Sequence, residues 1–253
     1  MENKLDKIYF ETLQEYNNTP LAKDEGWTRE YSKYTFTQIK MINEVLIKDA
    51  KILDIGTGSG IVPIFFKKKN YNVITIDNFE TGGNALSNIN LFEIKNKNVD
   101  LNKGHLPFED NEFDVINMGD VIEHLPNSPK KVMMECNRVL KKNGHILIST
   151  PNSIRLINRL KLMFGNSVWP KIETFYFKDY NETHHHEYTL KELKFVLNDN
   201  GFSIDKIKFF EENINIDNRF NSFYGKFIKI LLNLTLNLIP KLKSNMIIRA
   251  KKN

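Results

Sequence analysis

The chain has 253 residues, and 41% of them are hydrophobic, which suits one domain with a substantial core and excludes a disordered chain. A single cysteine, Cys136, excludes a disulfide framework, and no apolar signal region follows Met1, so we expect a protein of the reducing cytoplasm. The net charge is +5, but residues 241–253 hold five bases and no acid, which leaves 31 bases (36 minus 5) against 31 acids and predicts no nucleic-acid partner.

Residues 1–47 precede the first predicted strand. Up to residue 26 they are polar and aperiodic, which predicts a loosely docked segment with one short helix over 5–16. Apolar residues then recur at three- and four-residue steps from 28 to 47 and predict an amphipathic helix. Trp27, Tyr31 and Tyr34 lie at its start, where they either pack the helix on the sheet or line a pocket.

A short apolar run from Lys51 to Ile55 predicts a strand buried in a parallel sheet. Gly56, Gly58 and Gly60 follow at alternate positions, and an apolar run then predicts a helix. Glycine has no Cβ, so it suits unusual backbone dihedral angles and lets a ligand lie against the backbone. This turn therefore predicts a ligand-binding site.

The spacing of the glycines in this turn restricts the class of ligand that it can bind. A dinucleotide turn has the pattern G-x-G-x-x-G, whereas Ile61 stands three positions after Gly58, and no G-K-[ST] of a triphosphate loop follows. The next predicted strand ends at Asp77, where a carboxylate can accept hydrogen bonds from both hydroxyls of a ribose. The pattern predicts an adenosine-like ligand without a pyrophosphate.

These residues resemble motif I and the second-strand acid of the class I S-adenosylmethionine-dependent methyltransferases. The resemblance implies S-adenosylmethionine as the cofactor, with its methionine end on the three glycines and its ribose on Asp77. It also implies a wider set of cofactor-binding residues, namely Asp54, Thr57, Asn78 and Gly119.

Residues 104–125 extend this resemblance. The run L-P-F-x-D-x-x-F-D (106–114) and the triplet E-H-L (123–125) flank a predicted strand and are similar to the quinone-biosynthesis-like (type 11) branch. That branch has an acid or amide beside the adenine, here either Asp100 or Asn102, with Leu101 between them. Residues 99–101 are themselves predicted as a short third strand. His124 lies at the mouth of the predicted site, as a base or as a structural hydrogen-bonding residue.

The resemblance continues to about residue 153. Ser128-Pro129 predicts the start of a helix, Gly144 its end, and residues 145–150 the fifth strand. The runs R-V-L-K-x-x-G (138–144) and T-P-N (150–152) are also similar to the family.

Residues 153–188 are an insertion after the fifth strand. They contain a predicted helix over 155–164, an aromatic-rich stretch and three consecutive histidines, 184–186. Insertions at this place commonly build acceptor recognition, so we expect residues 1–47 and 153–188 to form an acceptor cap on a single domain of residues 1–253. Three consecutive rings do not easily converge on one ion, so no metal is predicted. Relatives have a histidine before E-[FY]-[ST], which makes His184 the first candidate catalytic residue, with His124 and Tyr31 as the others.

The remaining residues complete the predicted fold. Thr189-x-x-Glu192 is a capping box, residues 202–209 are the sixth strand, and 222–238 form an apolar helix too short to span a bilayer. Residues 245–251 are the final strand, antiparallel as in the resembled family. The predicted fold is α/β and Rossmann-like, a seven-stranded sheet with helices on both faces and the last strand antiparallel.

The expected activity is methyl transfer to a small-molecule or nucleotide-linked acceptor. Resemblance to members found with surface-polysaccharide genes implies O-methylation of a sugar or phosphoryl intermediate of capsule or lipopolysaccharide assembly. The alternatives are C- or O-methylation of a quinone or lipid precursor, and a non-catalytic adenosylmethionine-binding protein. No N-P-P-[YF] motif of a nucleic-acid methyltransferase follows the fourth strand. Weak contact of residues 222–240 with a membrane surface is a further option.

Overall fold

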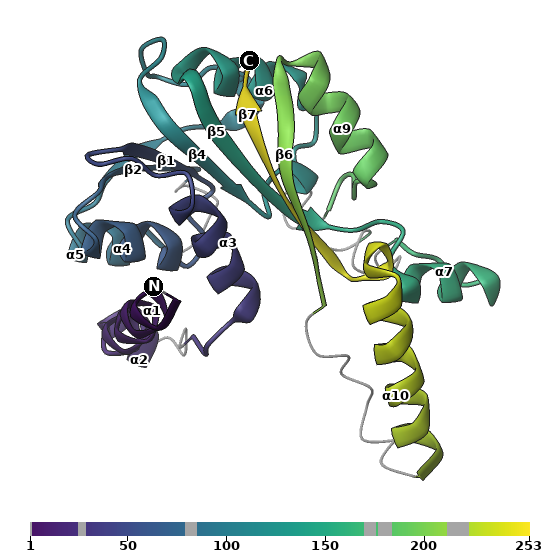
Figure 1. Ribbon diagram of the computed structural model, residues 1–253. Coiled ribbons are helices and arrows are strands. Elements are labelled where there is room, and N and C mark those ends of the chain that lie inside the picture. The colour runs from purple at the N-terminus through teal and green to yellow at the C-terminus, as the bar shows by residue number, and fades with distance from the viewer. Residues whose placement is uncertain (1, 25–28, 79–84, 170–175, 177–183, 212–222) are drawn as a thin grey trace.

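The computed structural model describes residues 2–24, 29–78, 85–169, 176, 184–211 and 223–253. They form a seven-stranded sheet in the order β3-β2-β1-β4-β5-β7-β6 (Figure 1). The strands are β1 (Lys51–Ile55), β2 (Asn72–Asp77), β3 (Lys95–Asn98), β4 (Phe113–Gly119), β5 (Leu140–Pro151), β6 (Phe202–Phe210) and β7 (Asn245–Lys252). Strand β7 runs antiparallel to both β5 and β6, while β1 to β5 pair in parallel, so the predicted fold is confirmed.

Helices cover both faces of the sheet, because alternate residues of the buried strands point to opposite layers. One layer contains α1 (Glu2–Asn17), α2 (Pro20–Asp24), α3 (Lys33–Asn43), α4 (Ile61–Lys68) and α5 (Ala85–Leu91). The other contains α6 (Lys130–Val139) and α9 (Leu190–Asp199). Three short 3₁₀ helices are η1 (Leu101–Lys103), η2 (Ile122–His124) and η5 (Pro240–Leu242).

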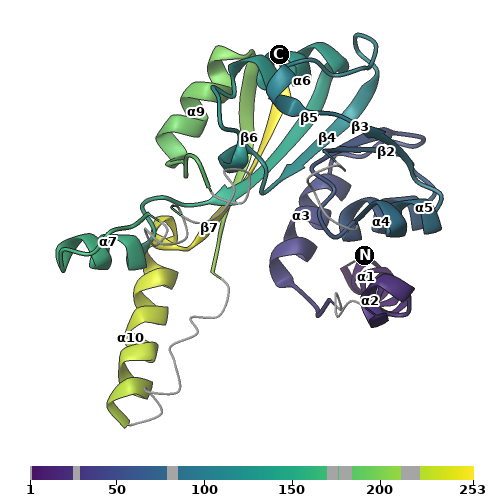
Figure 2. The same ribbon diagram turned by 180° about the vertical axis from the view of Figure 1, so that it is seen from behind.

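Two helices lie outside these layers. Helix α7 (Leu156–Met163) follows β5, and α10 (Phe223–Leu238) projects away from the sheet in both views (Figures 1 and 2). Among the described residues, no helix has the length and apolar character needed to cross a membrane.

The order of the strands fixes where a ligand can bind. Strand β1 pairs with β2 on one side and with β4 on the other, so the chain changes direction across the sheet at β1. In open α/β sheets, ligands bind beyond the carboxyl ends of the strands at this switch point. The turn after Ile55, the end of β2 at Asp77 and the end of β4 at Gly119 all meet there.

The N-terminal segment is docked, not loose as its polar sequence predicts. In α1, the side chains of Tyr9, Leu13 and Tyr16 are buried in the same cluster as Phe65 of α4. These three residues recur at steps of four and three, so they share one helical face although most of their neighbours are polar. Helix α3 is shorter than predicted, since Ser32 is its N-cap and accepts a hydrogen bond from the Thr35 amide.

Two further predictions are wrong. The third strand is Lys95–Asn98, and not 99–101, because Asp100 caps η1 with a hydrogen bond from the Asn102 amide. Helix α6 has Pro129 rather than Ser128 as its N-cap and ends at Val139, because Leu140 is already extended and begins β5. Gly144 therefore lies within β5, where a Cβ would come 2.9 Å from the Asp114 carbonyl oxygen.

Candidate functional site

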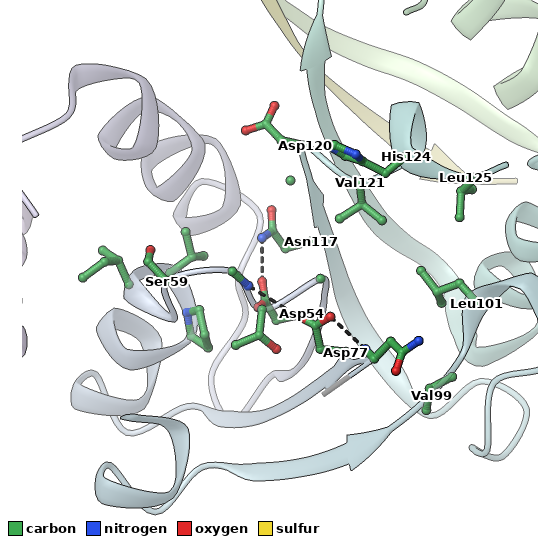
Figure 3. Close-up of a pocket in the computed structure, with 18 of the residues that line it drawn as sticks. Asp54, Ser59, Asp77, Val99, Leu101, Asn117, Asp120, Val121, His124 and Leu125 are labelled. Carbon is green, nitrogen blue, oxygen red and sulfur yellow. Dashed lines mark hydrogen bonds between the residues drawn. The ribbon is translucent and has the colours of Figure 1, made fainter. Parts of the chain in front are cut away.

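A cavity of about 570 Å³ opens at the carboxyl ends of the parallel strands (Figure 3). Its size suits a drug-sized or cofactor-sized ligand. The glycine turn, the ends of β2 and β4, η1, η2 and α3 all contribute to its wall. Every predicted cofactor residue except Gly60 lines it, namely Asp54, Gly56, Thr57, Gly58, Asp77, Asn78, Asp100, Leu101, Asn102 and Gly119.

The three glycines of the turn have positive φ angles of 75°, 51° and 78°, a region in which residues with a Cβ are strained. Their surroundings differ, however. A Cβ on Gly56 would lie 2.2 Å from Cγ2 of Val121, so that position needs glycine for packing. A Cβ on Gly58 would meet no described atom within 4 Å and would project into open space at the cavity wall. Gly58 thus leaves room for a ligand.

Three buried polar side chains at the cavity, those of Asp54, Thr57 and Asn117, each have one atom without a partner among the described residues. Asp54 accepts a 2.6 Å hydrogen bond from Nδ2 of Asn117 through Oδ1, while its Oδ2 has no such partner. Burial raises the pKa of Asp54 to about 7. The hydroxyl of Thr57 is also buried and unpaired within the described part of the chain. Since buried polar atoms normally have partners, these groups fit a polar ligand such as the methionine end of S-adenosylmethionine.

Asp77 lies at the end of β2 and faces the glycine turn across the cavity floor (Figure 3). Its Oδ2 accepts a 3.4 Å hydrogen bond from the Gly58 amide and its Oδ1 a 2.8 Å bond from the Asn78 amide. Burial raises the pKa of the carboxyl. A carboxylate held by two backbone amides in a cavity wall is suited to accept hydrogen bonds from ribose hydroxyls.

The two candidates for the adenine contact both line the cavity. Asp100 accepts the Asn102 amide through Oδ1 at 3.0 Å, which fixes its carboxylate, and Leu101 lies between them. The alternative between Asp100 and Asn102 therefore stays open.

Helix α3 forms part of the cavity wall. Thr35 and Gln38 line the cavity, and Nε2 of Gln38 donates a 3.1 Å hydrogen bond to the Ser149 hydroxyl of β5. The Tyr34 hydroxyl donates to Oδ1 of Asp120, the residue after β4, at 2.8 Å. Among the described residues of the predicted cap segment 1–47, those of α3 reach the cavity.

The predicted acceptor-side histidines come together. His124 lines the cavity, and the ring of His184 packs edge-on against it with centroids 4.7 Å apart. Nδ1 of His184 lies 3.2 Å from Oε1 of Glu187, and both carboxylate oxygens of Glu187 accept hydrogen bonds from Arg155. The hydrogen bond to Glu187 raises the pKa of His184. Burial would raise the pKa of Glu187, but His184 and Arg155 outweigh it and bring that pKa to about 2.

The end of the insertion is anchored to η2 through Glu123. The amides of His185 and His186 donate to the Glu123 carbonyl oxygen at 2.7 and 3.3 Å. The Glu123 carboxyl is buried, which raises its pKa to about 7, and its Oε2 accepts a 2.9 Å bond from the Thr150 hydroxyl. These bonds place His184 beside His124.

Within the described residues, one group could hold a cation. Ligand atoms of Glu123, His124 and His184 lie within 4.8 Å of one another. The three consecutive histidines do not form such a group, because His184 pairs with Glu187 whereas His186 lies 3.5 Å from Glu192.

The structure places Tyr31 away from the cavity, unlike the two histidines. Its hydroxyl donates a 2.9 Å hydrogen bond to Asp6 of α1, and its ring packs against Tyr9. Trp27 and most of the aromatic stretch of the insertion, including Phe175, Phe177 and Tyr180, lie outside the described residues.

Sequence reasoning missed several polar residues of the site. Glu187 could have been found, since it stands three residues after His184, a spacing at which side chains can pair. Arg155 and Gln38 gave no signal, because their partners are 32 and 111 residues away in the chain. Asn117 lies on the buried strand β4, where hydrophobic patterning does not single out one polar side chain.

Comparison with known proteins places the chain in a family. Residues 27–207 match a family described as a methyltransferase domain. An uncharacterised protein of Methanocaldococcus jannaschii is 32% identical over 110 residues, which is 44% of each chain. A ubiquinone biosynthesis O-methyltransferase of Cronobacter sakazakii is 29% identical over 108 residues, 40% of this chain and 42% of that protein. The chain thus spans less than half the length of these curated relatives.

Solved structures share the fold. An S-adenosylmethionine-dependent methyltransferase of Methanosarcina mazei superposes with a TM-score of 0.56 at 22% identity, covering 84% of this chain and 96% of that one. Another, from Archaeoglobus fulgidus, gives a TM-score of 0.58 at 21% identity, with 85% and 92% covered. The cavity has the size and the polar groups to hold S-adenosylmethionine, and with the family match over residues 27–207 the chain belongs to the methyltransferase domain family.

Proposed function

We propose that this enzyme methylates a hydroxyl oxygen of a small acceptor, and that His184 is the base that receives the hydroxyl proton. The observation that carries the proposal is the contact of the His184–Glu187 pair with His124, which lines the cofactor cavity. A carboxylate-bound histidine beside a methyl-donor site suits a neutral hydroxyl acceptor, because a positioned base can accept the hydroxyl proton.

The cofactor residues divide between the two ends of the cavity. Asp54, Thr57 and Gly58 would hold the methionine end, Asp77 the ribose, and Asp100 or Asn102 with Leu101 the adenine. Bound S-adenosylmethionine supplies an already activated methyl group. The protein then has to align the acceptor and keep water out, and α3 lies over the cavity in a position to do so.

The hydrogen bond to Glu187 fixes the proton position on His184. Glu187 is ionised and accepts only, so Nδ1 carries the proton and Nε2 has the free lone pair in the neutral ring. Nε2 would take the proton of the acceptor hydroxyl while the hydroxyl oxygen bonds to the methyl carbon and the methyl–sulfur bond breaks, with S-adenosylhomocysteine as the leaving group. Arg155 holds Glu187 in place, and His124 orients the acceptor from the cavity wall.

Helix α3 and residues 184–188 form the acceptor cap in this proposal. A second cavity of about 750 Å³ adjoins the first, shares Leu125 and Pro126 with it, and is lined by His185, Tyr188 and Phe195. Its position beside His124 suits the part of the acceptor that does not react.

The first candidate acceptor is a phenolic hydroxyl of a quinone or lipid precursor. The ubiquinone O-methyltransferase relatives and the aromatic wall of the second cavity favour it. The second candidate is a sugar or nucleotide-linked intermediate of surface polysaccharides, which the polar side chains of Thr35, Gln38 and Asp120 favour.

The experiment that tests the proposal is an acceptor screen with labelled S-adenosylmethionine, read by mass spectrometry. Catechol-type quinone precursors and nucleotide sugars are offered to the wild type and to Asp77→Ala as a cofactor-binding control. A methyl group on oxygen in a wild-type reaction supports the proposal, and methylation on carbon contradicts it. Cofactor binding without turnover of any acceptor would favour the non-catalytic alternative.

A further inference from the structure

Helices α7 and α10 present large apolar side chains to solvent. Leu162, Met163 and Phe164 at the end of α7 are all more than half exposed, with Phe164 at 72%. On α10, Leu231, Leu234 and Leu238 are also more than half exposed, with Leu238 at 82%. We refer to these six side chains as the apolar surface. Soluble proteins seldom expose such side chains in groups unless they meet a partner.

The three leucines of α10 share one face of the helix. At 100° per residue, positions 231, 234 and 238 fall within an arc of about 60°. Leu236, which points elsewhere on the helix, is buried, with 3% exposure. The helix therefore has a defined exposed stripe and a different face toward the protein.

Both helices leave the sheet at the same place. Pro151 at the end of β5 pairs with Asn245 at the start of β7. Asn152 then joins the two segments, because its Nδ2 donates to the carbonyl oxygens of Lys241 and Lys243 and its amide to that of Ser244. Figures 1 and 2 both show α7 beside the end of α10 that meets the sheet. The two parts of the apolar surface are thus held on one side of the molecule.

The charges of these segments have one sign. Residues 156–169 and 223–243 contain six Lys or Arg and no Asp or Glu, namely Arg159, Lys161, Lys226, Lys229, Lys241 and Lys243. The rest of the chain has 30 bases (36 minus 6) against 31 acids. The two segments that carry the apolar surface therefore hold six positive charges that no acid within them offsets.

We propose that α7 and α10 dock this enzyme on an anionic membrane surface. Exposed leucine, methionine and phenylalanine side chains with lysines and no acids are the composition of interfacial helices, whose apolar face enters the headgroup boundary. The basic side chains contact anionic headgroups, and each adds roughly a fivefold gain in binding. Neither helix crosses the bilayer, in agreement with the lengths of the described helices.

The placement has a consequence for catalysis. Helix α7 begins just after the carboxyl end of β5, and His124 follows the carboxyl end of the neighbouring strand β4. Docking through α7 therefore brings the acceptor side of the enzyme to the lipid surface. The inference goes beyond methyl transfer and does not depend on which acceptor is methylated.

The test is vesicle flotation of the full chain at 50 mM salt. Vesicles of phosphatidylcholine alone are compared with vesicles that contain about one third phosphatidylglycerol. We expect co-flotation with the anionic vesicles, at least tenfold weaker binding to the neutral ones, and release as salt is raised through the range where screening sets in. Equal binding to both vesicle types, or none to the anionic ones, would overturn the proposal.

Variants distinguish vesicle binding by the apolar surface from nonspecific hydrophobic binding. Leu234→Gln with Leu238→Gln should weaken binding at least tenfold, while Leu91→Gln with Met134→Gln, at similarly exposed positions elsewhere, should not. Lys161→Glu with Lys241→Glu should weaken binding to the anionic vesicles more than the control pair Lys142→Glu with Lys95→Glu does. Affinity for S-adenosylhomocysteine should be unchanged in all four, which separates failure of docking from failure of the methyltransferase site.

Sedimentation equilibrium tests the competing explanation, in which the apolar surface is a dimer interface. If the wild type forms a dimer that Leu234→Gln with Leu238→Gln dissociates, and anionic vesicles bind both proteins equally, the apolar surface belongs to a second copy of the chain and the membrane proposal is wrong.

Discussion

The hydroxyl of Tyr34 donates a 2.8 Å hydrogen bond to Oδ1 of Asp120, although 86 residues separate the two in the chain. This bond joins α3 to the residue that follows β4, across the mouth of the cofactor cavity. Asp120 adopts a φ angle of +54°, a left-handed conformation that a non-glycine residue rarely holds without support. Tyr34 is buried whereas Asp120 is exposed, so the bond is shielded from water on the side of the tyrosine.

Tyr34→Phe should therefore loosen α3 over the cavity. Loss of a hydrogen bond to a charged group costs about 1.5–3 kcal/mol, so urea unfolding should show a drop in the free energy of unfolding of that order. Release of S-adenosylhomocysteine should become faster. Tyr31→Phe is the matched control, because it removes a hydroxyl bonded to the exposed Asp6 and should change neither quantity.

Asp77→Ala should remove the ribose contact. Each lost charge-assisted bond weakens binding by about 1.5–3 kcal/mol, or about tenfold to a hundredfold in the dissociation constant. Titration calorimetry measures the dissociation constant for S-adenosylmethionine. Asp110→Ala is the control, because it removes an exposed carboxylate outside the cavity. Unchanged affinity in Asp77→Ala would contradict the assigned cofactor site. Parallel titrations of Asp100→Ala and Asn102→Ala would decide which residue contacts the adenine.

The glycine turn allows a paired test. In Gly56→Ala the new Cβ would lie 2.2 Å from Val121, so the protein itself should lose stability, by about 1–3 kcal/mol for an overpacked site. In Gly58→Val the new Cβ meets no described protein atom within 4 Å, so the loss of stability should be limited to the backbone strain of a side chain at a φ of +51°, while cofactor binding is lost because the side chain enters the cavity. Thermal unfolding and calorimetry on both variants separate the two effects. Equal losses of stability would show that both glycines serve the turn alone.

The base role of His184 predicts a pH dependence. A base must be neutral, so kcat should rise with pH through the pKa of His184, which the Glu187 bond holds above its usual value. In Glu187→Gln this support is weakened, so the rise should move to lower pH. His184→Asn should lower kcat by about 10²–10⁴-fold with little change in cofactor affinity. If His184→Asn keeps full turnover at every pH, His184 is structural and His124 becomes the candidate base.

Chelation tests the prediction that no metal takes part. Glu123 already accepts a hydrogen bond from Thr150 and His184 already pairs with Glu187, so a cation would have to compete with these contacts. Activity after dialysis against a chelator should therefore equal that of the untreated enzyme. Loss of activity that one divalent cation restores, and that Glu123→Gln abolishes, would instead make Glu123, His124 and His184 a metal site.

The sequence predicts the sheet well, and it also predicts residues that line the cavity, because both depend on local patterns. The apolar run of β1, the alternating glycines and the acid at the end of β2 each report on their own strand or turn. The edge strand β3 has the sequence K-N-K-N and no apolar face, so no such pattern reveals it. The buried face of α1 consists of residues spaced about one helical turn apart within a polar segment, so the overall composition of that segment does not reveal it.

The acceptor side depends on long-range pairs and is harder to predict. The pairing of Arg155 with Glu187 spans 32 residues, and that of Gln38 with Ser149 spans 111. Hydrophobic periodicity says which face of an element is buried, but it does not say which polar side chains meet once the elements are assembled. The histidines could be named from the sequence, whereas their contact with each other could not.

The position of β7 has a consequence for the order of assembly on the ribosome. Strand β7 lies between β5 and β6, and among the described strands it is the only one with which β6 pairs. Residues 202–210 therefore cannot join the sheet until residues 245–252 have been synthesised, and β5 keeps an open edge during the same interval. In the folded protein, Arg249 of β7 donates hydrogen bonds both to Asp205 of β6 and to Glu44 after α3, so one residue near the end of the sequence connects two segments that are synthesised earlier. A nascent chain stalled before residue 245 should expose that edge to chaperones and to neighbouring nascent chains.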